Sequence, residues 1–244
     1  MGLALAERLS AAGAAVDVLE AGPQLGGLTT HHDYGQFHWD RFYHVILPSD
    51  THLLGLLRDL DLGDQVRWSK TLTGYHVDGE AHSLSTPMEL LRFPLLGPVE
   101  KARLVWTILY CSRIRDWRRL ERVSVQDFLV RVSGRRTFEK FWEPLLLAKM
   151  GEEYRKVSAV FIWTYVKRMF SARDSSASNE QLGHVSGGYR TVFDRLLGRI
   201  ERRGGTVRTR SPVGSIRPHS SGGLSVETPD GSSRYDRVVF TAPT

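Results

Sequence analysis

The spacing of apolar side chains changes several times along the chain, and each change marks a different kind of element. From Leu3 to Leu9 apolar residues recur at helical spacing, and Gly13 is placed to end that helix. Residues 15–19 form a short β-rich run that closes on an acid, Glu20, before a glycine-containing loop. The first thirty residues therefore predict helix, turn, strand and loop, in that order.

The next seventy residues predict one helix and a small accessory sheet. A helix is expected over residues 49–60, where the apolar stripe consists of Leu53, Leu56, Leu57 and Leu60. Residues 65–76 then alternate between polar and apolar side chains, and Asp78-Gly79 is a strong turn signal. We interpret this stretch as a β-hairpin attached to the first segment of the fold.

From residue 86 to residue 173 the pattern is mostly helical. One helix is predicted from about Glu100 to Arg122, and a second begins at the capping-box-like Ser124. A third is predicted over residues 138–150, where Pro144 should kink or divide it. A long helix after Ser158 completes this region.

A polar linker at residues 174–181 precedes a return to mixed helix and strand. Gly187-Gly188 introduces a helix that Gly204-Gly205 ends, and strands are predicted near residues 206–209, 213–216 and 224–228 and over 235–241. These changes divide the chain into a first segment with its hairpin (1–84), a helical insertion (85–175) and a second segment (181–244).

Composition and charge limit the classes of function. The 244 residues are 41% hydrophobic and 25% charged, as in a globular protein, and no apolar run approaches the roughly 20 residues of a membrane-spanning helix. Cys111 is the single cysteine, which excludes an internal disulfide and fits a cytoplasmic protein. His31 and His32 are adjacent and would point to opposite sides of an extended chain, so no metal site is expected.

The net charge of +6 is concentrated in one place. Five arginines lie within ten residues, diluted by Asp116 and Glu121: Arg113, Arg115, Arg118, Arg119 and Arg122. Beside the apolar loop 93–99, such a cluster could bind an anionic membrane peripherally, or it could be an ordinary solvated helix face. Both interpretations stay open at this point.

The chemistry of the first thirty residues points to a nucleotide. In a dinucleotide-binding βαβ unit, the acid at the end of the second strand binds a ribose hydroxyl, and the spacing from Gly2 to Glu20 suits that role. Gly2 would be the third glycine of the usual G-x-G-x-x-G turn, so the first strand and two glycines are not in this sequence. The chain is therefore expected to be a fragment of a longer protein.

Three stretches together resemble the flavin amine oxidase superfamily, which includes amine oxidases, protoporphyrinogen oxidases, carotenoid desaturases and, more distantly, UDP-galactopyranose mutases. The first runs from Gly2 through Val16-Asp-Val-Leu-Glu-Ala21 to Gly26-Gly27, and the second is residues 37–46. The third comprises Gly187-Gly188, Gly204-Gly205, Ser211-Pro-Val213-Gly-Ser-Ile216, Asp230-Gly231 and Val238-Val-Phe-Thr-Ala-Pro243. The resemblance implies an α/β fold, an FAD/NAD(P)-binding Rossmann-like domain interrupted by a mostly helical substrate domain.

The same resemblance implies FAD as the cofactor and assigns roles to particular positions. Gly2 would face the pyrophosphate, Glu20 would bind the adenosine ribose, and the Val213 backbone would hold the adenine edge. The remaining implied positions are Gly26 and Gly27, where backbone would pass close to the cofactor, and Tyr43, His44 and Thr241, nearer the isoalloxazine. This sequence departs from the family pattern at Leu28, where many amine oxidases have arginine, and at Phe42, where glycine is usual.

The implied activity is an FAD-dependent oxidoreductase that removes hydride from a C–N or C–C bond of a small-molecule organic substrate. The helical insertion and the apolar loop favour a bulky or lipid-like substrate, and the electron acceptor is not indicated. Two alternatives stay open, a mutase-like flavin isomerase and a non-catalytic remnant whose basic helix binds membrane or nucleic acid. No nucleic-acid partner is expected for the enzyme.

Overall fold

The computed structural model describes the whole chain except residues 43, 72–73, 78, 172–180 and 243–244. It divides into two compact units, each assembled from separate stretches. The α/β unit comprises Met1–Ile46, Thr51–Arg67 and His184–Thr244, and the helical unit comprises Leu47–Asp50 and Trp68–Gly183. The first boundary lies at Arg67 and not near residue 84, because the hairpin groups with the helical unit. The second lies at His184, three residues after the predicted 181.

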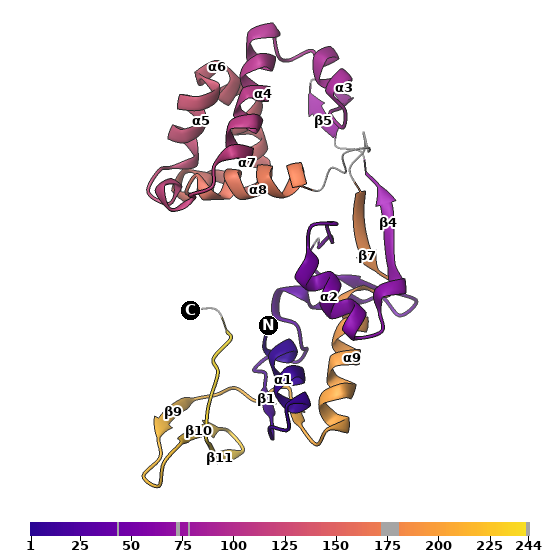
Figure 1. Cartoon of the computed structure of the whole chain (residues 1–244), viewed down its shortest axis with the longest axis vertical. Coiled ribbons are helices and arrows are strands. Elements are labelled where there is room, and N and C mark those ends of the chain that lie inside the picture. Colours follow the sequence, from indigo (N-terminus) through magenta and orange to yellow (C-terminus); the bar gives the residue numbers. More distant parts are fainter. Residues whose placement is uncertain (43, 72–73, 78, 172–180, 243–244) are drawn as a thin grey trace. The chain divides into compact units, whose positions relative to one another are not determined.

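The α/β unit is built around a parallel pair of strands and two helices. Helix α1 (Gly2–Ala11) leads into strand β1 (Asp17–Leu19), and helix α9 (Gly188–Arg202) leads into strand β8 (Thr206–Arg208), as Figure 1 shows. Strands β1 and β8 pair in parallel, with Val18 opposite Val207. The α9–β8 turn needs glycine at 205, because a Cβ there would lie 2.6 Å from Ile200 Cγ2.

Smaller elements complete this unit. They are the 3₁₀ turn η1 (Gly27–Thr29), the antiparallel strands β2 (His31–Asp33) and β3 (His38–Asp40), helix α2 (Thr51–Asp59), the 3₁₀ turn η2 (Gly63–Gln65), and the antiparallel sheet of β9 (Ser215–Pro218), β10 (Leu224–Thr228) and β11 (Gly231–Tyr235). The core is formed by Leu3, Ala6, Ile46, Leu57, Leu60, Leu62, Val185, Val192, Leu196 and Ile200. The leucine stripe predicted for residues 49–60 thus contributes Leu57 and Leu60 to the buried core.

The chain passes between the units along strands β4 (Val66–Lys70) and β7 (Gln181–Val185), which pair with each other. The helical unit then begins with the hairpin of β5 (Gly74–Val77) and β6 (Glu80–Ser83). Its helices are α3 (Pro87–Arg92), α4 (Pro98–Arg113), α5 (Val125–Ser133), α6 (Arg135–Thr137), α7 (Glu143–Met150) and α8 (Val160–Ser171), with 3₁₀ turns at Arg118–Leu120 and Gly151–Lys156. Phe93, Phe128, Leu129, Trp142, Tyr154 and Ile162 are among the buried residues of its core.

Several local predictions are confirmed in this unit. The Ser124 hydroxyl accepts a hydrogen bond from the Asp127 N–H and caps α5, which ends before Gly134 at φ 81°. The predicted division at Pro144 is also present, because a π-helical turn (Phe138–Trp142) precedes α7 and places the proline in its first turn.

The predicted helix from Glu100 to Arg122 is wrong beyond Arg113. Ile114 is extended, with ψ 120°, and its carbonyl accepts hydrogen bonds from Trp163 Nε1 at 3.1 Å and Lys167 Nζ at 3.4 Å. Side chains of α8 thus donate hydrogen bonds to the carbonyl group directly after α4, and the helix ends at Arg113. Most of the arginine cluster consequently lies in turns.

The predicted strand over residues 235–241 is also wrong. Strand β11 ends at Tyr235, and the described residues after it form no ladder with any described strand. Val239 and Phe240 are exposed. A strand needs a neighbour to pair its backbone groups, and apolar alternation alone does not provide one.

Candidate functional site

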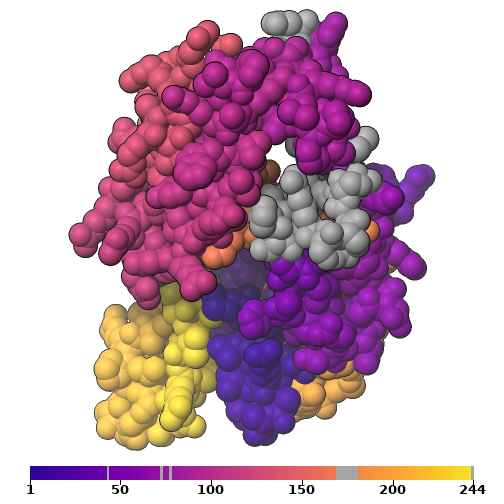
Figure 2. Space-filling model, turned by 45° about the horizontal axis from the view of Figure 1, so that its top comes forward, coloured from indigo at the N-terminus to yellow at the C-terminus, as the bar shows by residue number. Residues whose placement is uncertain are grey.

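The first turn of α1 is open to an anionic group. No side chain among the described residues caps this helix, and its first turn contains no acid. A Cβ at Gly2 would lie 3.0 Å from Thr241 Oγ1. Figure 2 shows the indigo N-terminal and yellow C-terminal residues side by side on the surface of the α/β unit. Free N–H groups at a helix start favour a phosphate, and the Thr241 hydroxyl adds a donor beside them.

The carboxyl ends of strands β1 and β8 lie at the same edge of the α/β unit as the start of α1. The Glu20 N–H donates to the Arg208 carbonyl at 2.9 Å, and the Ser211 N–H donates to the Glu20 carbonyl at 2.9 Å. Val213 follows two residues later and is partly exposed. Because α1 runs antiparallel to β1, the start of α1 and the end of β1 share one edge, which is where open parallel sheets bind ligands.

The Glu20 carboxylate is held in place by its own loop. Its Oε1 accepts a hydrogen bond from the Gly22 N–H at 2.8 Å, and the Gly22 carbonyl in turn accepts from the Arg210 N–H at 3.0 Å. One carboxylate oxygen is thereby fixed, and the other accepts no hydrogen bond from any residue that the structure describes. An ordered carboxylate of this kind can accept from two neighbouring hydroxyls.

Ser211 is a candidate site residue that the sequence analysis did not single out. Its side chain is 2% exposed, and its hydroxyl has no hydrogen-bond partner within the part of the chain that the structure describes. A buried hydroxyl without a hydrogen bond usually lowers the free energy of unfolding by about 1–3 kcal/mol, which a bound ligand could offset by forming that hydrogen bond. The signal was available, because Ser211 begins the Ser-Pro-Val stretch that carried the family resemblance.

The two loop glycines differ in what surrounds them. Gly26 has φ 117°, and a Cβ there would lie 2.4 Å from Cε2 of Phe193 on α9. Gly27 has φ 58°, and a Cβ there would meet nothing within 4 Å. The close approach at Gly26 is therefore to the Phe193 ring, whereas Gly27 faces open space.

His44 and Asp40 gather at the start of α9. The His44 ring packs edge-on against Tyr189, with centroids 5.7 Å apart, and its Nδ1 lies 2.7 Å from the Phe42 carbonyl oxygen. The Asp40 carboxylate accepts from the Tyr189 N–H at 3.2 Å, as expected for an acid at a helix N-terminus. Tyr43, the remaining predicted position, lies outside the described residues.

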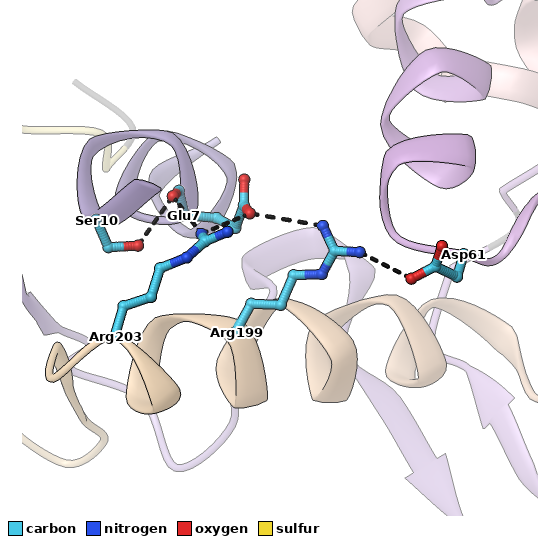
Figure 3. A network of polar contacts seen from close by, with 5 residues as sticks. All are labelled: Glu7, Ser10, Asp61, Arg199 and Arg203. Atoms are coloured by element: carbon cyan, nitrogen blue, oxygen red, sulfur yellow. Dashed lines mark hydrogen bonds and ion pairs between the residues drawn. The ribbon is translucent and has the colours of Figure 1, made fainter. Parts of the chain in front are cut away.

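An ion-pair network fixes α1 against α9 (Figure 3). The buried Glu7 accepts from Arg203 Nη1 at 2.8 Å and lies 3.7 Å from Arg199 Nη1. Arg199 also pairs with Asp61 at 2.9 Å, and the Ser10 hydroxyl donates to the Glu7 carbonyl. The network holds the helix whose start is the candidate phosphate site.

Asp17 joins the parallel pair to the β9–β11 sheet. Its carboxylate accepts from the Tyr235 hydroxyl at 2.8 Å and from the Thr206 hydroxyl, and Arg208 lies 3.5 Å away. Burial alone would raise the pKa of Asp17, but these hydrogen bonds and the arginine charge hold that pKa below 3.8. Burial and the hydrogen bond to Asp17 raise the pKa of Tyr235 above 10.0.

The fold and this edge are typical of nucleotide-binding α/β proteins, and comparison with known proteins identifies the family. The family model described as flavin containing amine oxidoreductase matches residues 2–244. The chain belongs to this family, whose cofactor is FAD. The predicted superfamily is thereby confirmed.

Individual relatives agree with this assignment. The carotenoid phi-ring synthase of Streptomyces griseus is 27% identical over 264 residues, which cover 98% of this chain and 50% of the relative. Two solved structures share the fold at 19% identity and a TM-score of 0.69, an oxidoreductase from Methanosarcina mazei and a putrescine oxidase with putrescine bound. They are matched over 96% and 99% of this chain and 55% of their own. The chain thus spans about half the length of these relatives.

Proposed function

We propose that this chain provides the FAD-binding edge of an FAD-dependent oxidoreductase that removes hydride from a C–N or C–C bond of an organic substrate. The observation that carries the proposal is the edge at the carboxyl ends of β1 and β8, where Glu20 is bonded to Ser211, whose hydroxyl has no hydrogen-bond partner among the described residues, together with the uncapped start of α1. Its donors and acceptors suit an adenosine diphosphate: N–H groups for phosphate, a fixed carboxylate for ribose, and the buried Ser211 hydroxyl as a further donor. The residues present therefore fit the cofactor.

In this proposal each residue has a binding role. The α1 N–H groups at Gly2 and the Thr241 hydroxyl hold the pyrophosphate, so Thr241 acts there and not nearer the isoalloxazine. Glu20 accepts from the ribose, and the Val213 backbone lines the adenine edge. His44 lies toward the end of the proposed site that would hold the flavin ring. Bound flavin would supply the hydride acceptor, and the protein contributes binding and orientation.

The loop glycines have separate roles in the proposal. Gly27, with open space around it, is where backbone can pass close to the cofactor. Gly26 instead makes room for Phe193, which packs against the core of the α/β unit.

We further propose a bulky, apolar substrate. The helical unit contains a cavity of about 280 Å³ between α7 and α8, with apolar walls from Leu145, Phe161 and Ile162. Lys149 lies at this cavity with its Nζ 5.5 Å from the centre of the Tyr165 ring. A mostly apolar cavity with one placed charge suits an apolar molecule, and a relative of this chain is a carotenoid phi-ring synthase.

Flavin binding tests the first proposal. Quenching of FAD fluorescence on titration gives a dissociation constant, and Glu20→Gln should raise it by about ten- to a hundredfold, because a charged hydrogen bond contributes about 1.5–3 kcal/mol. Glu201→Gln, on the exposed end of α9, is the matched control and should leave it unchanged. Equal effects of the two variants, with unaltered circular dichroism, would refute the role of Glu20.

Anaerobic reduction of the bound flavin tests the reaction. An apolar polyene and a primary amine serve as the two candidate hydride donors. Reduction by the polyene supports the proposed substrate, and reduction by the amine replaces it with an amine oxidase. Flavin that only an external reductant reduces would favour the isomerase alternative.

A further inference from the structure

Helix α4 has apolar residues on two sides, and the core of the helical unit covers one of these sides. Leu104 and Cys111 are buried in the core of the helical unit, together with Thr107. The opposite side carries a second row at helical spacing, formed by Val99, Ala102, Trp106 and Tyr110 and closed by Arg113. We call this row the outer stripe. A helix with a second apolar row outside the core normally packs that row against another apolar surface.

The outer stripe is exposed. Val99 is 64% and Trp106 59% exposed, and the rings of Trp106 and Tyr110 stack with centroids 6.3 Å apart. Large aromatic side chains in a row on the surface mark an interaction site rather than ordinary surface composition.

The charged side chains that follow the stripe are mostly basic, with Asp116 and Glu121 among five arginines. The single acid of α4 is Glu100, which is buried and pairs with Arg136 at 3.6 Å. The stripe ends at Arg113, and the arginine cluster begins there. The side chains of Arg118 and Arg119 are 77% and 90% exposed, and among the described residues they form ion pairs with Asp116 alone, at 3.8 and 4.0 Å.

A third aromatic residue lies within residues 115–122, the arginine-rich segment after α4 that we call the basic turn. Trp117 is partly exposed, and the Arg118 guanidinium lies 5.5 Å from the centre of its ring. Tryptophan and tyrosine beside arginine are the combination that lies at the headgroup level of a bilayer, where the rings enter the interface and the cations meet anionic lipid.

We propose that the outer stripe and the basic turn form a docking surface for the headgroup region of an anionic lipid bilayer. The chain lies on the membrane through this surface, since no described helix is both long and apolar enough to cross one. The surface differs from the predicted basic helix, because α4 ends before most of the arginines. The proposal is independent of flavin binding and can hold if the proposed activity fails.

Charge and shape argue against the other partners. In a symmetric pair of chains, the arginines of two copies would face each other and repel. The aliphatic side chains of Val99 and Ala102 at the start of the stripe can neither stack on bases nor bind phosphates, whereas they can enter the interfacial region of a bilayer.

Vesicle co-sedimentation of the 244-residue chain tests the proposal. The chain should bind phosphatidylcholine vesicles that contain phosphatidylserine, and binding should weaken as salt is raised. Arg118→Gln with Arg119→Gln should weaken partitioning about 30-fold, at about fivefold for each arginine near the surface. Arg195→Gln with Arg202→Gln, two exposed arginines of α9, is the charge-matched control and should have little effect.

A separate variant tests the contribution of the aromatic side chains to membrane binding. Trp106→Ser should weaken partitioning roughly tenfold, because the exposed indole no longer enters the interface. Trp39→Ser removes a tryptophan of similar exposure, 67% against 59%, from strand β3 and should not weaken partitioning. Circular dichroism establishes that each variant is folded.

Three results would overturn the proposal. The first is no binding of the parent chain to anionic vesicles. The second is an equal loss in the stripe variants and their controls. The third is a dimer that Trp106→Ser dissociates, or a complex with a polynucleotide, in the absence of vesicle binding.

Discussion

Replacing Gly26 by alanine gives a sharp test of how the glycine loop is packed. The new Cβ would lie 2.4 Å from Phe193 Cε2 and 2.9 Å from its Cζ, and the backbone has φ 117°. Strain of an L-residue at this φ costs about 1–3 kcal/mol, and overpacking against the ring adds about 1–3 kcal/mol. We therefore expect Gly26→Ala to lower the free energy of unfolding of the α/β unit by about 2–6 kcal/mol.

Two further variants separate strain from overpacking. Gly27→Ala has φ 58° and open space around its Cβ, so it should cost only the strain of a left-handed residue, about 1–2 kcal/mol. Phe193→Leu removes the Cε and Cζ atoms that the Gly26→Ala methyl would contact. In the Gly26→Ala background it should restore about 1–3 kcal/mol, which a double-mutant cycle measures as coupling.

Urea unfolding followed by circular dichroism and tryptophan fluorescence is the assay. The transition of the α/β unit should shift and that of the helical unit should not, which provides an internal control. The reasoning fails if Gly26→Ala costs no more than Gly27→Ala, or if Phe193→Leu brings no relief. A loss of FAD binding without a loss of stability would show instead that Gly26 serves the cofactor directly.

Four other predictions concern single side chains. Because the folded-state pKa of Asp17 is depressed, its contribution to stability should be present above about pH 4 and be lost as pH falls through the folded pKa, and Asp17→Asn should flatten that acid part of a pH–stability curve. Tyr235 has a raised pKa, so its contribution should be lost at the alkaline end, as pH rises through the folded pKa above 10.0. Glu7→Ala leaves Arg203 partly buried without its carboxylate and should lower the unfolding free energy by about 2 kcal/mol, measured in urea. Burial raises the pKa of Cys111 to about 11, so iodoacetamide at about pH 8 should leave this thiol unmodified in the folded chain and alkylate it in urea; rapid labelling without urea would contradict the packing of α4.

Features that depend on neighbours in the sequence were predictable. The order helix, strand, Glu20 and glycine loop, the Ser124 cap and the helix end at Gly204 each follow from local hydrogen bonding or from the φ that glycine allows. The family resemblance rested on such local signals, and the family match confirmed it.

The sequence alone did not determine features that depend on residues distant in the chain. The end of α4 is set by Trp163 and Lys167, which bind the Ile114 carbonyl from 49 and 53 residues away. Phe193 determines what Gly26 contacts, and only the packed core distinguishes the buried side of α4 from its outer stripe. Hydrophobic periodicity shows that a side chain needs cover but not which residue covers it, because that depends on how separate segments meet in space.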